Sequence, residues 1–336
     1  MAKNRFDQLI DQWDDKLRAA FEQSIKDIRD QAQIERLAQM LARGDVDGAL
    51  RAVGINPAAF RPLDRALEAA FEAGGNATAG SLPVRTAADG LRVQFQFDVR
   101  NPTAEQWLRN HSSEMIREIV DDQRTMIRNS LTASMERGQN PRTAALDLVG
   151  RVNPTTRRRE GGLVGLTSSQ EEWVRRYAEE LRNLDPRALG RALRDKRFDA
   201  TVRRAISDGR AIPAETLANM VAAYKNRALR YRAESIGRTE AMASLGQSQE
   251  EAMTQAINAG AVDVATVTSI WHDSADRRVR KTHKAMNGQR VRYGQPFVSP
   301  SGARLRYPGD PDAPAAERIH CRCWREFDVD FLAGVE

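Results

Sequence analysis

Apolar side chains recur at steps of three and four residues along three long stretches of the chain, which is the spacing of one face of an α-helix. These stretches predict helices over residues 6–28, 103–137 and 214–258. Arg238 and Gln249 interrupt the repeat of the third stretch, which favours an ordinary packed helix over a coiled coil. The first stretch has no obvious partner in the neighbouring sequence, so we expect its apolar face to bind another protein.

Alternation of apolar and polar residues, the period of a half-buried strand, is confined to shorter segments. Residues 91–99 alternate in this way and predict a strand. From Val262 onward the chain changes to short β-like runs separated by Pro and Gly turns, with one small helix near residues 276–286. The β-like runs lie at residues 264–271, 289–293 and 320–329.

Together these patterns predict an α+β protein, mainly α-helical, in which long amphipathic helices precede a small C-terminal α+β domain. The predicted segments are an N-terminal helical region (1–80), a linker with a strand (81–100), a basic helical region (101–260) and the C-terminal α+β domain (261–336). In an alternative division the core of this last domain begins near residue 230.

The composition, 41% hydrophobic and 29% charged, is that of a chain rich in amphipathic helix. No apolar run reaches the roughly 18 residues of a membrane span, and the first residues are charged where a signal peptide has its apolar core. We therefore expect neither a membrane span nor secretion. The two cysteines, Cys321 and Cys323, exclude a disulfide framework and fit a reducing compartment.

The chain has 52 Lys and Arg against 46 Asp and Glu, and the whole excess lies in its middle third. Residues 101–239 contain 26 basic and 18 acidic side chains, and the loop of residues 151–165 carries Arg157, Arg158 and Arg159 in a row. Such a segment attracts phosphate or an acidic protein surface, although i,i+4 ion pairs on a solvated helix face use many such charges equally well. Residues 151–165 are predicted to form a loop, a hinge or a β-hairpin tip.

The usual catalytic signatures are missing: the chain has no phosphate-binding loop, no His-Glu-x2-His, no Gly-x-Ser-x-Gly and no dinucleotide fingerprint after a strand. This disfavours an ATPase, a zincin and an α/β-hydrolase. The residue types best suited to catalysis or metal binding lie in the tail, where three of the four histidines accompany both cysteines. They are His272, His283, His320, Cys321 and Cys323.

Two structural interpretations of the tail remain open. Imidazole and thiolate are preferred zinc ligands, so Cys321, Cys323 and His283, with either His320 or His272, are candidate ligands of a structural zinc ion. The usual zinc knuckle, however, has two to four residues between its ligands. We therefore favour buried, reduced cysteines and a His283 that is hydrogen-bonded within the fold, with no cofactor.

Two catalytic interpretations rank lower. A thiolate beside an imidazolium is a nucleophile, but nothing in the sequence supplies an oxyanion hole or an orienting third group. The carboxylates Glu240, Asp273 and Asp276 are candidate ligands of a hard divalent ion in a nuclease. Asp276, however, stands where the N-cap of the small helix is expected, which is a structural task.

Six blocks of residues, taken in order, resemble the Mu F-like phage head morphogenesis, or minor head, proteins. The blocks are residues 162–170 (GLVGLTSSQ) with Trp173, 194–199 (RDKRFD), 231–240 (YRAESIGRTE), 271–288 (WHDSADRRVRKTHKAMNG), 308–310 (PGD) and 320–323 (HCRC). His320 stands where that family commonly has Asn. The family motif corresponds here to Arg238, Glu240, Trp271, Asp276, Arg278, His283, Gly288, Cys321 and Cys323.

The resemblance implies a structural minor head protein of a tailed phage or prophage, without enzymatic activity or catalytic residues. The expected place is the portal vertex of the virion head, reached by assembly in the host cytoplasm, with a role in head assembly, DNA packaging or DNA delivery. The implied partners are the portal protein, the head shell and packaged double-stranded DNA, and the candidate contact residues are Arg157, Arg158, Arg159, Arg194 and Arg197. The alternative is a phage-encoded effector enzyme, a metal- or Cys/His-dependent nuclease or toxin.

Overall fold

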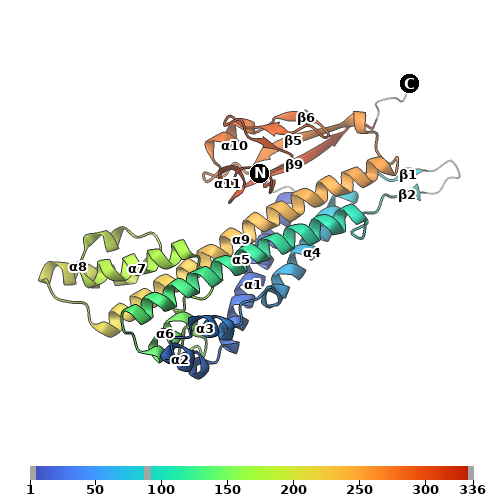
Figure 1. Cartoon of the computed structure of the whole chain (residues 1–336). Coiled ribbons are helices and arrows are strands. Elements are labelled where there is room, and N and C mark those ends of the chain that lie inside the picture. Colours follow the sequence, from blue (N-terminus) through green and yellow to red (C-terminus); the bar gives the residue numbers. More distant parts are fainter. Residues whose placement is uncertain (1–4, 87–91, 332–336) are drawn as a thin grey trace. The chain divides into compact units, whose positions relative to one another are not determined.

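A computed structural model describes residues 5–86 and 92–331 of the chain (Figure 1). The helices are α1 (Arg5–Gln31), α2 (Ile34–Ala42), α3 (Val46–Val53), α4 (Arg61–Ala79), α5 (Pro102–Glu136), α6 (Pro141–Val149), α7 (Ser168–Arg182), α8 (Asp199–Asp208), α9 (Ala214–Asn258), α10 (Lys281–Met286) and α11 (Ala315–Arg318). The strands are β1 (Arg85–Thr86), β2 (Arg92–Val93), β3 (Arg151–Val152), β4 (Arg159–Glu160), β5 (Val267–Asp273), β6 (Arg290–Arg292), β7 (Phe297–Val298), β8 (Arg304–Leu305) and β9 (Cys323–Val329). The predicted fold class, mainly α-helical α+β, is confirmed, since helices make up 64% of the structure.

Residues distant in sequence are grouped into two compact units. Unit 1 comprises residues 1–20, 63–113 and 234–336, and unit 2 comprises residues 21–62 and 114–233. The long helices α1, α5 and α9 contribute residues to both units. The consecutive segments 1–80, 81–100, 101–260 and 261–336 stay a prediction.

Unit 2 consists mainly of helices, with the hairpin β3–β4 at one loop, so the hairpin alternative for residues 151–165 is confirmed. The following loop is held by buried arginines. Arg29 donates hydrogen bonds to the carbonyls of Gly162 and Val164, and Arg232 donates one to the carbonyl of Gly165. Burial lowers the pKa of each of these arginines to about 10. Residues 162–170, the first of the six blocks that resemble the Mu F-like proteins, are therefore fixed within unit 2 by these buried arginines.

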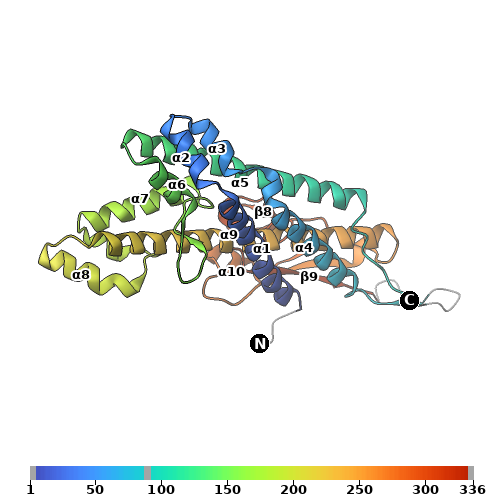
Figure 2. The same ribbon diagram turned by 90° about the horizontal axis from the view of Figure 1, so that it is seen from below.

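Unit 1 is organised around the second half of α9, whose residues 241–249 are buried on every side. Figure 2 shows α1 and α4 alongside this half of the helix. Small residues permit the close approach. A Cβ on Gly237 would lie 2.6 Å from the carbonyl oxygen of Asp14 in α1, and one on Gly74 of α4 would lie 2.2 Å from Ser248 Oγ.

The C-terminal part of unit 1 is a three-stranded antiparallel sheet in the order β6-β5-β9, with a separate hairpin of β7 and β8. In Figure 1 it lies along the second half of α9, with α10 and α11 at one end. Trp271 is paired with Arg325, and Asp273 with Cys323, so the start of β9 meets the end of β5. This register brings the Cys-x-Cys segment beside the Trp271 end of the central strand.

Arg325 anchors this sheet to α9. Its side chain is almost fully buried, forms an ion pair with Glu250 and donates a hydrogen bond to the carbonyl of Gly246. The guanidinium also lies over the ring of Phe327, 4.3 Å from its centroid. A charged residue in a β-like run is usually expected on the solvent face, so the residue pattern did not indicate this anchor.

The expectation that the apolar face of residues 6–28 binds another protein is wrong. Six side chains of this face are buried within the chain itself, because helices distant in sequence supply the missing partner surface. In unit 2, for example, the rings of Phe21 and Phe60 stack with centroids 6.3 Å apart. The buried side chains are Ile10, Trp13, Leu17, Phe21, Ile25 and Ile28.

The predicted strand over residues 91–99 is mostly wrong. Leu91 lies outside the described residues, and in the described part the strand covers only Arg92–Val93, paired with Arg85–Thr86. Among the described residues, positions 94–98 have no neighbouring strand. Phe95 and Phe97 are half-buried, and the Phe97 ring lies 5.9 Å from that of Phe71 in α4. The alternation thus belongs to a segment without strand pairing whose apolar side chains pack against helices.

Candidate functional site

Three elements of the C-terminal region bring His283, Cys321 and Cys323 together. His283 lies on α10, Cys323 is the first residue of β9, and Cys321 lies in the bend between α11 and β9. His320 produces this bend with a left-handed backbone (φ 55°), which is uncommon for a non-glycine residue. The bend is fixed further by a hydrogen bond from the Cys321 amide to the Arg318 carbonyl.

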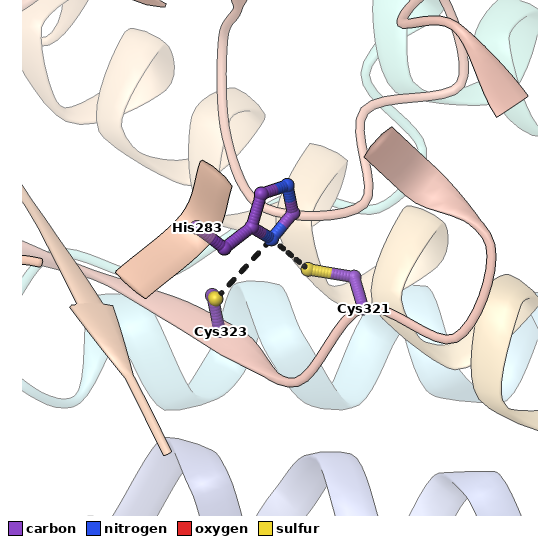
Figure 3. Close-up of side chains that lie close together, drawn as sticks. All are labelled: His283, Cys321 and Cys323. Atoms are coloured by element: carbon purple, nitrogen blue, oxygen red, sulfur yellow. Dashed lines mark hydrogen bonds between the residues drawn. The ribbon is translucent and has the colours of Figure 1, made fainter. Parts of the chain in front are cut away.

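The three side chains converge on one point (Figure 3). His283 Nδ1 lies 3.5 Å from Cys321 Sγ and 3.4 Å from Cys323 Sγ. All three residues are at most 1% exposed. The Trp271 ring packs edge-on against the imidazole, with centroids 5.1 Å apart. The cluster is therefore sealed by aromatic and backbone groups.

Glu317 occupies the other side of the imidazole. Its Oε2 lies 2.9 Å from His283 Nε2, although the contact is off the direction of a hydrogen bond. Hydroxyl groups of Thr282, Ser299 and Ser301 donate to the same carboxylate. Burial raises the pKa of Glu317, but these hydroxyls and His283 outweigh it, and the pKa is lowered overall. Glu317 is thus a buried carboxylate in its ionised form.

The two thiols are electrostatically different. Burial by itself raises the pKa of Cys321, yet hydrogen bonds with Cys323 and His283 lower it well below its usual value. The hydrogen bond with Cys321, followed by burial, raises the pKa of Cys323. The pair therefore favours one thiolate, on Cys321, with the proton retained on Cys323.

Arg238, on the second half of α9, binds the backbone of the cluster residue Cys321. Its Nε donates to the Cys321 carbonyl at 2.9 Å, and its Nη1 lies 3.0 Å from Asp11 Oδ1 in α1. Gly288 has φ 81° and donates its amide to the Trp271 carbonyl at 2.8 Å. These two residues of the motif therefore position the backbone around the cluster.

The remaining motif residues lie elsewhere. Glu240 is paired with His111 on α5, at 2.7 Å. Asp276 accepts hydrogen bonds from the backbone and guanidinium of Arg278, which lower the pKa of its carboxyl. The small helix begins only at Lys281, so the expected helix N-cap at Asp276 is wrong, and Asp276 caps a turn instead.

Among the described residues, His283, Cys321 and Cys323 form the group of potential metal ligands that comes within coordination range. The carboxylates Glu240, Asp273 and Asp276 are not part of such a group. His320, offered by the sequence as a fourth ligand, instead has its Nε2 2.9 Å from Ser235 Oγ. His272 contacts Glu326 and stacks on Trp324, away from the cluster. Glu317 was missed, because an acidic residue in a four-residue helix gives no sequence signal.

The candidate contact arginines in unit 2 fall into two groups. Arg157 and Arg158 are exposed at the tip of the hairpin β3–β4, and among the described residues neither has an ion-pair partner. Arg159 is half-buried and donates to the Gly150 carbonyl. Arg194 and Arg197 form ion pairs with Asp199 and Asp195, respectively. Within this set, the available positive charge therefore lies at the hairpin tip.

Residues 196–325 match the family model described as Phage Mu protein F like protein. This segment, less than half of the chain, contains α9, the histidine–cysteine cluster and the C-terminal sheet as far as the third residue of β9. The resemblance is thus confirmed: this part of the chain is similar to the Mu F-like proteins, a family that suggests a role in phage head morphogenesis. The matched segment begins at residue 196, upstream of the predicted core. No curated protein and no solved structure matches the chain significantly.

In the described residues, every helix is too short or too polar to cross a membrane.

Proposed function

We propose that this chain is a structural minor head protein of a tailed phage or prophage, located at the portal vertex and acting in head assembly, DNA packaging or DNA delivery. The observation that carries the proposal is the Mu F-like match over residues 196–325. The proposed partners are the portal protein, the head shell and packaged DNA. The proposed place of assembly is the host cytoplasm, and the final place is the virion head.

The proposed role is structural and includes no catalytic turnover. Burial of the Cys–His cluster supports this, because a nucleophile must reach its substrate, whereas Cys321 and Cys323 are 1% and 0% exposed. The paired surroundings of Glu240 and Asp276 support it further, since each carboxylate is already engaged by a basic side chain. Both features favour the structural role over the effector-enzyme alternative.

The proposed DNA contact is the tip of the β3–β4 hairpin. Arg157 and Arg158 are exposed there and have no ion-pair partner among the described residues, so their charge is available to phosphate. The chain lacks a base-reading motif, so the contact is expected to be independent of DNA sequence. Contact with the portal is proposed through exposed surface, because the apolar face of α1 is already buried.

Heads purified from cells that produce the phage provide the test. The chain should be found by mass spectrometry in these heads in few copies and should be retained after a salt wash that removes loosely bound proteins. An abundant host protein of similar size serves as the control for contamination. Heads that assemble, package DNA and infect normally without any copy of the chain would contradict the proposal.

A further inference from the structure

We propose that His283 Nδ1, Cys321 Sγ and Cys323 Sγ together bind one Zn²⁺ ion, which links α10 to the C-terminal strand. Zinc bonds of about 2.3 Å to sulfur and about 2.0 Å to nitrogen place neighbouring tetrahedral ligands about 3.5 Å apart. The two nitrogen–sulfur distances here are 3.5 and 3.4 Å. Both nitrogen–sulfur pairs thus already have the spacing that the ion requires, and all three ligand atoms lie within 4.8 Å of one another.

A hydrogen bond at Nδ1 accounts for only one of the two sulfur contacts that the imidazole makes. A neutral or protonated imidazole offers a single lone pair or a single N–H at Nδ1, and so makes one good hydrogen bond there. Two sulfur atoms nevertheless approach this nitrogen at nearly equal distances. A metal ion at the centre of the three atoms contacts all of them at once.

The ligands are held in place by groups outside the cluster. The Arg238 guanidinium and the Arg318 carbonyl fix the backbone of Cys321 from two sides. The β5–β9 register fixes Cys323 opposite Asp273. The two cysteine ligands are therefore oriented by contacts outside the cluster, as is usual for a preorganised site.

The charge around the cluster also favours a cation. Glu317 is a carboxylate only 5% exposed, and its hydrogen-bond donors Thr282, Ser299 and Ser301 are neutral hydroxyls. Its Oε2 faces His283 Nε2, which leaves Nδ1 turned towards the sulfurs. A carboxylate behind a ligating histidine is a common second partner in zinc sites, where it fixes the ring and adds negative charge.

The donor set selects the kind of metal. Two cysteine sulfurs and one imidazole suit Zn²⁺ rather than Mg²⁺ or Ca²⁺, which prefer oxygen. The described residues supply three protein ligands, so water or another small ligand would take the fourth tetrahedral position, an arrangement otherwise typical of catalytic zinc sites. The burial of all three residues makes a structural cross-link the role of this ion.

The test uses the full-length chain, purified without chelator under reducing conditions and then loaded with Zn²⁺ or Co²⁺. The variants are Cys321→Ser and Cys323→Ser, and the matched control is His272→Ala, which removes a tail histidine on the other face of the sheet. The wild type and the control should hold one zinc per chain. With Co²⁺ they should show thiolate-to-cobalt charge-transfer absorption. Each serine variant should bind Zn²⁺ at least tenfold more weakly.

A second measurement needs only the wild type, in case a serine variant does not fold. Metal removal by a chelator should lower the Tm, and added Zn²⁺ should restore it in a concentration-dependent way, because an ion that binds only the folded chain stabilises it. A folded wild type that takes up no zinc and keeps its Tm would overturn the proposal. Equal zinc binding by the wild type and both folded serine variants would overturn it as well.

Discussion

Replacement of Arg325 by Met should destabilise unit 1 strongly. Arg325 is 2% exposed, forms an ion pair with Glu250 and donates to the Gly246 carbonyl at 3.2 Å. Methionine keeps the apolar stem but removes the charge, so Glu250 is left without its partner. Loss of one member of a buried ion pair costs about 3–5 kcal/mol. Because the Glu250 side chain keeps 20% exposure to water, we expect the low end, about 3 kcal/mol.

A matched control is available on the same sheet. Arg290 and Asp328 form an ion pair whose side chains are 55% and 51% exposed. Since exposed ion pairs contribute about 0–1 kcal/mol, Arg290→Met should lower the free energy of unfolding by less than about 1 kcal/mol. Both variants lose one positive charge from the sheet, so the comparison isolates the effect of burial.

Urea unfolding of the full chain, followed by tryptophan fluorescence, measures the change in the free energy of unfolding in both variants. The transition to compare is the one that reports on Trp271 and Trp324 in the sheet. The double variant Arg325→Met/Glu250→Gln should recover part of the loss, with a coupling free energy of about 1–3 kcal/mol. An Arg325→Met variant no less stable than Arg290→Met would refute the assignment of this ion pair as the anchor between sheet and helix.

Two further predictions concern unit 2. Replacement of Arg157 and Arg158 by Gln should reduce the slope of log affinity for double-stranded DNA against log salt by about 1.8, because each phosphate that is no longer neutralised changes the slope by about 0.9. The control variant Arg175→Gln/Arg176→Gln removes the same charge from arginines already paired with Glu172, and slopes that change equally in both variants would argue against the hairpin. The hydrogen bond from Arg197 lowers the pKa of Asp195 to about 2, so its stabilising contribution is complete above the unfolded pKa of about 3.9 and is lost as the pH falls towards 2. Thermal unfolding between pH 5 and 2 should therefore be less pH-dependent in Asp195→Asn than in the wild type, and identical profiles would exclude this role for Asp195.

The long helices were predictable because each combines a sustained apolar stripe with clear end signals. α9, for example, follows Pro213 and ends two residues before Gly260, as expected for a helix bounded by these residues. Packing partners were not predictable, because the surface that buries the stripe of α1 comes from residues far along the chain. The same limit explains the segment that contains Phe95 and Phe97. Its alternating apolar side chains pack against helices and not within a sheet.

The three side chains of the candidate site were predictable from the sequence, but their surroundings were not. The concentration of His283, Cys321 and Cys323 in the tail indicated that they meet, and the structure brings them together. Residue type did not reveal that His320 turns towards Ser235, since this depends on the left-handed bend before the cysteines. Nor did it reveal Glu317, whose role arises only from its position against the imidazole.

The copy number per head is the decisive measurement of the proposed location at the portal vertex. Heads assembled in cells with and without the portal protein should be purified and their chain content measured by quantitative mass spectrometry against the major shell protein. A chain located at the portal vertex should be found in a few copies per head when the portal is present, and its content should fall strongly when the portal is absent. An equal content in both kinds of head, or a content proportional to the shell protein, would contradict it.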